Sequence, residues 1–260
     1  MHLNPKKIHS ETNALFLDVD GTLLEIKDRP EDVRADTGLI ALLEQLLLLF
    51  DGAMALVSGR SIEDIDRIFN GVSFPAVGAH GAELRPSSTT ADAPTPEPLP
   101  DRVLERLHDF IDRYDGLQLE QKQGGVSLHY RRAPELHKQC RSLVQQLMLE
   151  LGPNFRLIEG KMVFEIAPQQ HNKGEAILLL LEAPAFSGRQ PVFIGDDVTD
   201  EDGFVVVNAM RGLSIRVGEE KPTAARYMLN NVGEVRDLLQ TIVELNNTHL
   251  ESRRTHGDNS

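Results

Sequence analysis

Two pairs of aspartates stand where nucleophilic and metal-assisted chemistry could be carried out. Asp18 and Asp20 follow a short apolar run in the segment DVDGTL, and Asp196 and Asp197 follow another in GDDVTDED. Because ligands in open α/β sheets bind at the carboxyl ends of strands, both pairs are expected at one sheet edge. Carboxylates at i and i+2 offer a nucleophile and a second acid, and oxygen ligands without histidine or cysteine favour Mg²⁺.

Simpler interpretations exist for each acidic segment. An Asx-turn accounts for Asp20 followed by Gly21, but not for a second acid at the end of a buried strand. The segment GDDVTDED could be a solvated acidic turn, and Thr199 or Asp200 in it could cap the following helix. Asp196 and Asp197 would then be left over for a metal ion.

Two further segments begin helices after a strand or loop. Ser58-Gly59-Arg60 offers a hydroxyl and helix N–H groups that can hold an anion, and Asn172-Lys173-Gly174 offers a cation. Each segment alone would be an ordinary cap or a surface lysine. The order Asp, Ser, Lys, Asp over four such segments indicates one site.

Composition limits the classes of function. The chain has 260 residues, a formal net charge of −13 and one cysteine. The acidity argues against nucleic-acid partners, and the lone Cys140 excludes an internal disulfide or a multi-cysteine zinc site. Cys140 is predicted to pack in a core, because apolar residues surround it at helical spacing. No apolar run suits a signal peptide or a membrane span, so a cytoplasmic protein without a membrane partner is expected.

Strands alternate with helices in both outer parts of the chain, which predicts an α/β fold with a doubly wound parallel sheet. The first part is expected to contain strands 14–17 and 53–57 and helices at 37–50 and after Ser61. The last part is expected to contain strands 191–194 and 213–217 and helices 173–181, 201–208, 223–229 and 235–245.

The middle of the chain has a different pattern. Residues 86–100 hold five prolines and almost nothing apolar, which indicates a linker. Helix, strand, strand then occurs twice, which predicts an inserted α+β domain with helices 101–114 and 134–151 and strands 117–122, 126–131, 155–159 and 162–166. The expected division is 1–85 and 168–245 for the core, 86–167 for the linker and insert, and 246–260 for a frayed tail.

These motifs resemble those of the haloacid dehalogenase superfamily of phosphatases, whose core is a Rossmann-like sheet that can carry an inserted cap domain. More narrowly, LDVDGTLLEI, LVSGR, GAHGAE, NKG and GDDVTDEDGF resemble the trehalose-6-phosphate phosphatases. The resemblance covers residues 14–243, insert included. It implies Mg²⁺-dependent hydrolysis of trehalose 6-phosphate in trehalose biosynthesis. A monomer is expected.

The resemblance also implies roles for the core residues. Asp18 would form an aspartyl-phosphate, and Asp20 would protonate the leaving sugar oxygen and then deprotonate water. Ser58 and Lys173 would contact the phosphoryl oxygens. Mg²⁺ would be held by the carboxylates of Asp18 and Asp196 and the backbone carbonyl of Asp20, with Asp197 or Asp200 orienting water or holding Lys173.

Substrate choice would come from the insert. Ser127, His129 and Arg131 alternate with apolar residues on one strand, and Lys161 and Glu165 share a face of another, opposite Met162, Phe164 and Ile166. If the resemblance is set aside, an ordinary solvated sheet face explains these polar residues. If the resemblance holds, the expected substrate-binding residues are Arg60, His80, Lys122, His129, Arg131, Lys161 and Glu165.

Two alternatives remain open at this point. The same scaffold could serve a phosphatase of another sugar phosphate, such as sucrose phosphate or a hexose phosphate. A sugar-phosphate-binding module without catalysis is the other, although it would need neither a nucleophile nor an acid.

Overall fold

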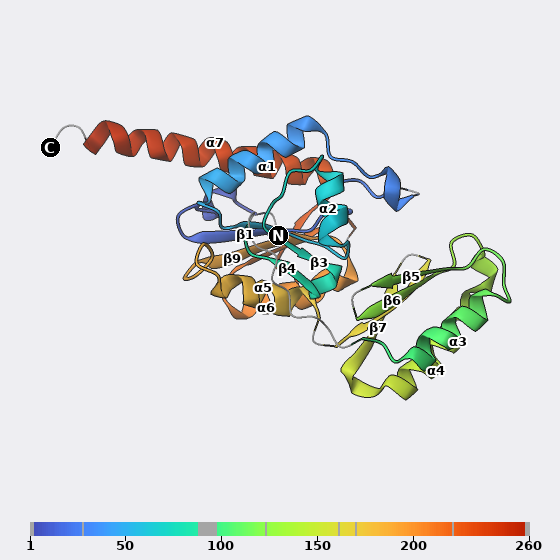
Figure 1. Cartoon of the computed structure of the whole chain (residues 1–260). Coiled ribbons are helices and arrows are strands. Elements are labelled where there is room, and N and C mark those ends of the chain that lie inside the picture. Colours follow the sequence, from blue (N-terminus) through green and yellow to red (C-terminus); the bar gives the residue numbers. More distant parts are fainter. Residues whose placement is uncertain are drawn as a thin grey trace. The chain divides into compact units, whose positions relative to one another are not determined.

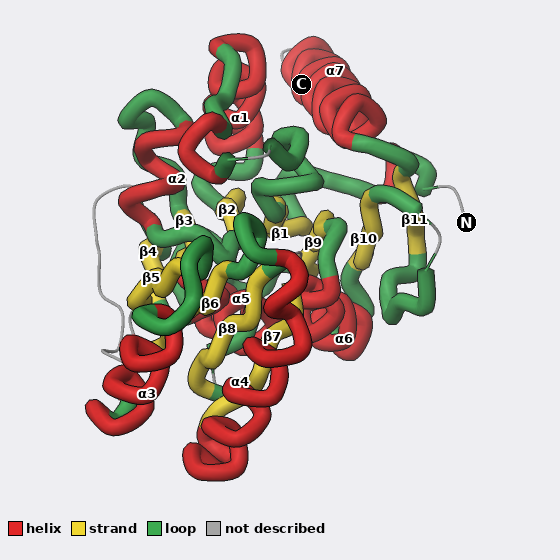
Figure 2. Tube along the Cα trace, turned by 90° about the vertical axis from the view of Figure 1, so that its right-hand side faces the viewer, coloured by secondary structure: helices red, strands yellow, loops and turns green. Residues whose placement is uncertain are grey.

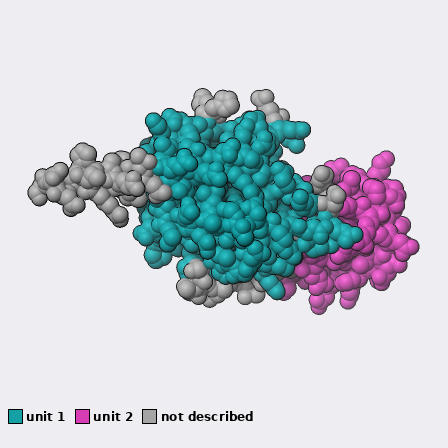
Figure 3. Space-filling view, turned by 90° about the horizontal axis from the view of Figure 1, so that it is seen from above, with its two compact units in different colours: residues 1–92, 173–260 teal, residues 93–172 magenta. Residues whose placement is uncertain are grey.

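The structure of the protein is a computed structural model that describes residues 3–27, 29–87, 98–122, 124–160, 162–169, 171–219 and 221–257. Two compact units divide the chain (Figure 3). The core unit comprises Met1–Asp92 and Lys173–Ser260, and the inserted unit comprises Ala93–Asn172. Most of the predicted linker lies outside the described residues. No helix in the described part of the chain has the length and apolar character of a membrane span.

The core unit is built on a seven-stranded sheet in the order β11-β10-β9-β1-β2-β3-β4. Only β3 and β4 pair antiparallel within it. Helices α1 and α2 lie with α7 on one face of the sheet, and α5 and α6 lie on the other (Figures 1 and 2). The strands are β1 Asn13–Leu17, β2 Met54–Val57, β3 Ala76–Gly78, β4 Glu83–Arg85, β9 Gln190–Gly195, β10 Leu213–Val217 and β11 Tyr227–Leu229. The helices are α1 Thr37–Leu49, α2 Ile62–Ile68, α5 Lys173–Glu182, α6 Glu201–Ala209 and α7 Val232–Gly257.

Helices on both faces explain the apolar runs that the sequence shows. Every residue of β1 and β2 is buried, so neither strand alternates between apolar and polar side chains. Phe16 packs at 5.6 Å from Phe186, ring centroid to ring centroid, within this core. The doubly wound α/β sheet expected from the sequence is confirmed.

Two helix predictions for the last part of the chain are wrong. Residues 223–229 do not form a helix: β11 pairs with β10 instead, with Tyr227 opposite Ile215. Side chains bind the backbone before this strand, because Ala224 donates its N–H to Glu201 and accepts from Asn208. The other error is at the end of α7, which continues beyond Leu245 to Gly257 because no proline or glycine stands between these two residues.

The inserted unit contains a four-stranded antiparallel sheet in the order β5-β6-β8-β7. Its elements are α3 Asp101–Ile111, β5 Gln118–Lys122, β6 Gly125–His129, α4 His137–Leu151, β7 Phe155–Gly160 and β8 Val163–Pro168.

Alternate residues of the inserted sheet form one hydrophobic core with the two helices. Val126, Leu128 and Phe164 are buried in it, and so is Cys140, as predicted. Met162 does not share this face. It is 39% exposed and has φ 63° in the turn before β8, so the strand begins one residue later than expected.

Candidate active site

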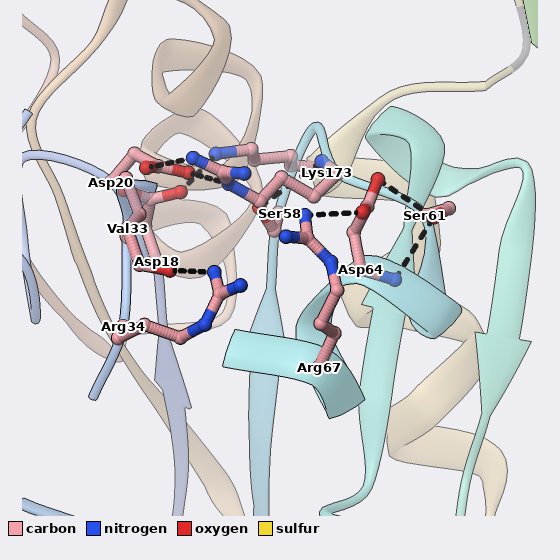
Figure 4. A network of polar contacts seen from close by, with 10 residues as sticks. Asp18, Asp20, Val33, Arg34, Ser58, Ser61, Asp64, Arg67 and Lys173 are labelled. Atoms are coloured by element: carbon pink, nitrogen blue, oxygen red, sulfur yellow. Dashed lines mark hydrogen bonds and ion pairs between the residues drawn. The ribbon is translucent and has the colours of Figure 1, made fainter. Parts of the chain in front are cut away.

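The two predicted aspartate pairs follow neighbouring parallel strands. β1 pairs with β9 so that Leu17 lies opposite Ile194, and the next N–H, that of Asp18, donates to the Ile194 carbonyl at 2.9 Å. Asp18 and Asp196 therefore leave the same edge of the sheet side by side. The labelled side chains of Asp18, Asp20, Ser58 and Lys173 gather in Figure 4.

Lys173 links the two acidic segments. Its Nζ donates to Asp18 Oδ1 at 2.7 Å and to Asp200 Oδ1 at 2.6 Å, and all three residues are buried. Lys173 opens α5, which lies close to α6: a Cβ on Gly174 would stand 2.6 Å from the Asp202 carbonyl oxygen. The glycine after the lysine therefore allows the two helices to approach.

Asp200 organises the turn after β9. Its Oδ2 accepts the N–H groups of Asp196 and Asp197, each at 2.9 Å, while its Oδ1 contacts Lys173. Asp197 forms a capping box with Asp200 at the start of the short 3₁₀ helix Val198–Asp200. Of the two weaker candidates from the sequence, Asp200 is the one that contacts the lysine.

Three carboxylates converge beside this one lysine. Oxygen atoms of Asp18, Asp196 and Asp200 all lie within 4.8 Å of one another. Burial, more than the neighbouring acids, raises the pKa of Asp196 to about 7. Burial also holds the pKa of Asp18 well above its ordinary value, against the pull of Lys173. Burial alone would lower the pKa of Lys173, but Asp18 and Asp200 raise it, so the lysine stays charged.

The cluster has the features of a cation site. Asp18 Oδ2 is buried and has no hydrogen-bond partner among the described residues. One lysine does not offset three carboxylates, and oxygen donors of this kind suit a hard divalent cation. Glycine at 21 is required for the approach of Asp196, because a Cβ there would stand 2.1 Å from Asp196 Oδ2 and φ is +85°. Asp20 and Asp197 contribute no carboxylate to the cluster.

Asp20 points to a different partner. Arg60 Nε donates to Asp20 Oδ2 at 2.6 Å and Arg60 Nη2 donates to Oδ1 at 2.7 Å. The carboxylate is therefore held through both oxygens by the residue two positions after Ser58. The sequence singled out both residues but gave no signal that they pair.

Ser58 follows β2 and is buried. Its Oγ accepts the N–H of Arg60 at 3.2 Å, and its carbonyl accepts the N–H of His80 at 3.1 Å. The His80 ring covers Gly59, where a Cβ would stand 2.4 Å from the imidazole. Ala79 and His80 both have left-handed φ values, 46° and 54°, in this tight loop. His80 thus supports the serine turn.

Glu83 is a contributor that the sequence analysis quoted in a motif but assigned no role. Its Oε2 accepts the N–H of Ile62 at 2.6 Å, at the start of α2. Ser61 caps the same helix by accepting the N–H of Asp64. Together they fix the helix start that follows the serine turn.

In the inserted unit a row of polar side chains crosses the sheet. Glu120 lies opposite Ser127, which lies opposite Glu165, and Ser127 Oγ donates to Glu165 Oε2 at 3.1 Å. His129 Nε2 contacts Glu120 Oε2 at 2.9 Å. Glu165 is 7% exposed, whereas Arg131 is exposed. Glu120 was missed by the sequence analysis, because nothing in its strand marks it.

The side chains of two predicted substrate-binding residues are not described by the structure. The position of Lys122 is described only by its backbone in β5. Lys161 lies outside the described residues.

Comparison with known proteins gives the family. The family model described as Trehalose-phosphatase matches residues 16–232. The chain belongs to this family. The trehalose-6-phosphate phosphatase of Escherichia coli (strain K12) is 38% identical over 242 residues, which cover 93% of this chain and 89% of that protein.

Solved structures extend the likeness to the fold. The C-terminal domain of Candida albicans trehalose-6-phosphate phosphatase has a TM-score of 0.78 at 22% identity, covering 94% of this chain and 98% of that one. A haloacid dehalogenase-like hydrolase from B. subtilis has a TM-score of 0.62 at 12% identity, covering 88% and 98%. These structures show that the chain has the haloacid dehalogenase fold. Its membership of the trehalose-phosphatase family makes it a phosphoric monoester hydrolase.

Proposed function

We propose that this chain hydrolyses trehalose 6-phosphate to trehalose and inorganic phosphate through an aspartyl-phosphate on Asp18. The observation that carries this mechanism is the pairing of a buried Asp18 with Lys173, with the second carboxylate oxygen of Asp18 left without a hydrogen-bond partner among the described residues. That oxygen is available either to a cation or to an electrophile. Family membership supports the choice of substrate.

A divalent cation, which we propose to be Mg²⁺, fits the acidic cluster. Asp18 and Asp196 would hold it through carboxylate oxygens, with the backbone carbonyl of Asp20. Bound there, it would offset the excess negative charge and polarise the phosphoryl group. Asp200 already accepts from Lys173 and two N–H groups, so its role is to hold that frame rather than to ligate.

The chain's own groups account for both displacements. Asp18 attacks phosphorus while Asp20 gives a proton to the departing sugar oxygen; Asp20 then takes a proton from the water that attacks the aspartyl-phosphate. Lys173 has three N–H donors, of which two bind Asp18 and Asp200, so the third can donate to a phosphoryl oxygen. The Ser58 hydroxyl, whose oxygen accepts from Arg60, can donate to another.

The polar row of the inserted sheet is the proposed recognition surface for the sugar. Glu165 and Ser127 form its centre, and Glu120 with His129 forms one end. Carboxylates, a hydroxyl and an imidazole accept and donate the hydrogen bonds that sugar hydroxyls need. Lys122, Arg131 and Lys161 stay predictions from the sequence, as do the cytoplasmic location and the monomeric state.

A phosphate-release assay tests the proposal. Purified enzyme is offered trehalose 6-phosphate, sucrose 6-phosphate and glucose 6-phosphate, with Mg²⁺ or with excess chelator. We expect trehalose 6-phosphate to give the highest kcat/KM and chelation to abolish release. Asp18→Asn should reduce release to background. A preference for another sugar phosphate would refute the substrate, and a tenth of wild-type activity in Asp18→Asn would refute the covalent mechanism.

A further inference from the structure

The contact between Arg60 and Asp20 is a forked ion pair. Two N–H groups of one guanidinium bind two oxygens of one carboxylate, at 2.6 and 2.7 Å. The Arg60 side chain is 14% exposed and that of Asp20 is 29% exposed, so water screens the pair only in part. This geometry makes it one of the strong polar contacts at the site.

The backbone of Arg60 is fixed at both of its polar groups. Its N–H donates to Ser58 Oγ, and its carbonyl accepts the N–H of Ala79 at 2.7 Å. Arg60 therefore extends from the turn that carries Ser58 to the turn that carries Asp20. Its N–H contacts Ser58 and its guanidinium contacts Asp20, two groups that the proposed function places around one phosphoryl group.

The pair conflicts with the proposed work of Asp20. A carboxyl group that gives a proton to a leaving oxygen needs one of its own oxygens turned toward that group. In the fork both oxygens already accept an N–H group of Arg60, so opening the fork would free an oxygen of Asp20 to face the leaving group. A guanidinium binds phosphoryl oxygens in the same forked manner as it binds a carboxylate.

We propose that Arg60 exchanges partners, leaving Asp20 for the phosphoryl group when the substrate binds, and that this exchange frees Asp20 for acid–base catalysis. The inference rests on the proposed function and adds an order of events to it. Arg60 thereby couples occupancy of the phosphate site to the release of the acid. Without phosphate, the fork keeps Asp20 turned away from the reaction.

A thermodynamic cycle tests the exchange by binding alone. Inorganic phosphate is titrated calorimetrically, at saturating Mg²⁺, into wild type, Asp20→Asn, Arg60→Met and the double variant. If Arg60 has to leave Asp20 to bind phosphate, Asp20→Asn should tighten phosphate binding about tenfold while Arg60 is present, because a charge-assisted pair no longer competes. In the Arg60→Met background the same change should give a smaller gain.

A merely structural or neutralising role for Arg60 predicts the opposite order. Arg60 would then already cancel the charge of Asp20 in wild type. Asp20→Asn would therefore increase phosphate affinity more in the Arg60→Met background, where that charge is not cancelled. An equal or larger gain there overturns the proposal. Wild type that binds no phosphate also overturns it, and loss of trehalose 6-phosphate hydrolysis in the same preparation would show that the proposed function has failed too.

Two controls keep the cycle interpretable. Arg67→Met removes a nearby arginine in α2, whose Nη2 pairs with Asp64 at 2.7 Å on the surface, and it should leave phosphate binding unchanged. Thermal unfolding of every variant checks the fold. Asp20→Ala replaces Asp20→Asn in the cycle if the latter does not fold.

Discussion

Asp196→Asn should stabilise the metal-free protein at alkaline pH. Burial raises the pKa of Asp196 from its ordinary value near 3.8 to about 7, so the folded state binds this proton more tightly than the unfolded chain does. The favourable contribution is complete below pH 4 and is lost as the pH rises through 7. At about 1.4 kcal/mol per pKa unit, the loss amounts to at most about 4 kcal/mol at pH 8. Because the buried carboxyl of Asp18 lies beside Asp196 and interacts with it, about 2 kcal/mol is the expected gain for the neutral asparagine.

Urea denaturation in excess chelator measures this gain at pH 8 and at pH 4.5, where the two proteins should be nearly equal. Asp237→Asn, on the exposed face of α7, is the control for the substitution itself and should change neither value. Mg²⁺ should raise the unfolding temperature of wild type and not that of Asp196→Asn. Equal or lower stability of Asp196→Asn at pH 8 would show that the charge of Asp196 is already compensated in the folded chain.

Three more substitutions separate the parts of the site. Gly21→Ala should weaken Mg²⁺ binding and phosphate release at least tenfold, because its Cβ would meet the Asp196 carboxylate. The control Gly71→Ala has a similar φ of +82° and nothing within 4 Å, so it should cost only about 1 kcal/mol of backbone strain. Calorimetry and thermal unfolding compare the two variants. Lys173→Met should lower the free energy of unfolding at pH 8 by about 3–5 kcal/mol, since it leaves buried carboxylates unpaired, and a loss below 1 kcal/mol in urea denaturation would contradict this. Glu165→Ala should lower kcat/KM for trehalose 6-phosphate by roughly 5- to 150-fold and leave p-nitrophenyl phosphate hydrolysis unchanged; equal losses on both substrates would assign Glu165 to the chemistry or the fold.

The parts of the site that the sequence predicted are those fixed by strand ends. An apolar run without alternation marks a strand covered on both faces, and the first acid after it must lie at the sheet edge. That reasoning placed Asp18 and Asp196 without any knowledge of long-range contacts. Lys173 was predicted for a similar reason, as the first residue of a helix.

Pairings between distant segments could not be predicted in the same way. Asp20 and Arg60 are 40 positions apart, and nothing local indicates which acid a given arginine will contact. The choice between Asp197 and Asp200 was equally open, because it depends on which carboxylate the turn directs toward Lys173.

Short strands were also not predicted from the sequence. β3, β4 and β11 have three residues each, which is too few for a period of two to be recognised. The helix expected at 223–229 failed for this reason, since its apolar spacing fits both structures. Tertiary contacts with β10 decide in favour of the strand.

The boundary between the two units has a consequence for attempts to exchange the insert for another. On the return side the inserted unit ends at Asn172, and the next residue is Lys173, the cation that holds Asp18 and Asp200. A graft whose splice extends one residue past this junction would replace Lys173 itself and leave the buried carboxylates of Asp18 and Asp200 without their cation. On the entry side the boundary comes after Asp92, beyond the end of strand β4 at Arg85. Chimaeras of this scaffold should therefore tolerate changes of length at the entry and require an exact splice at the return.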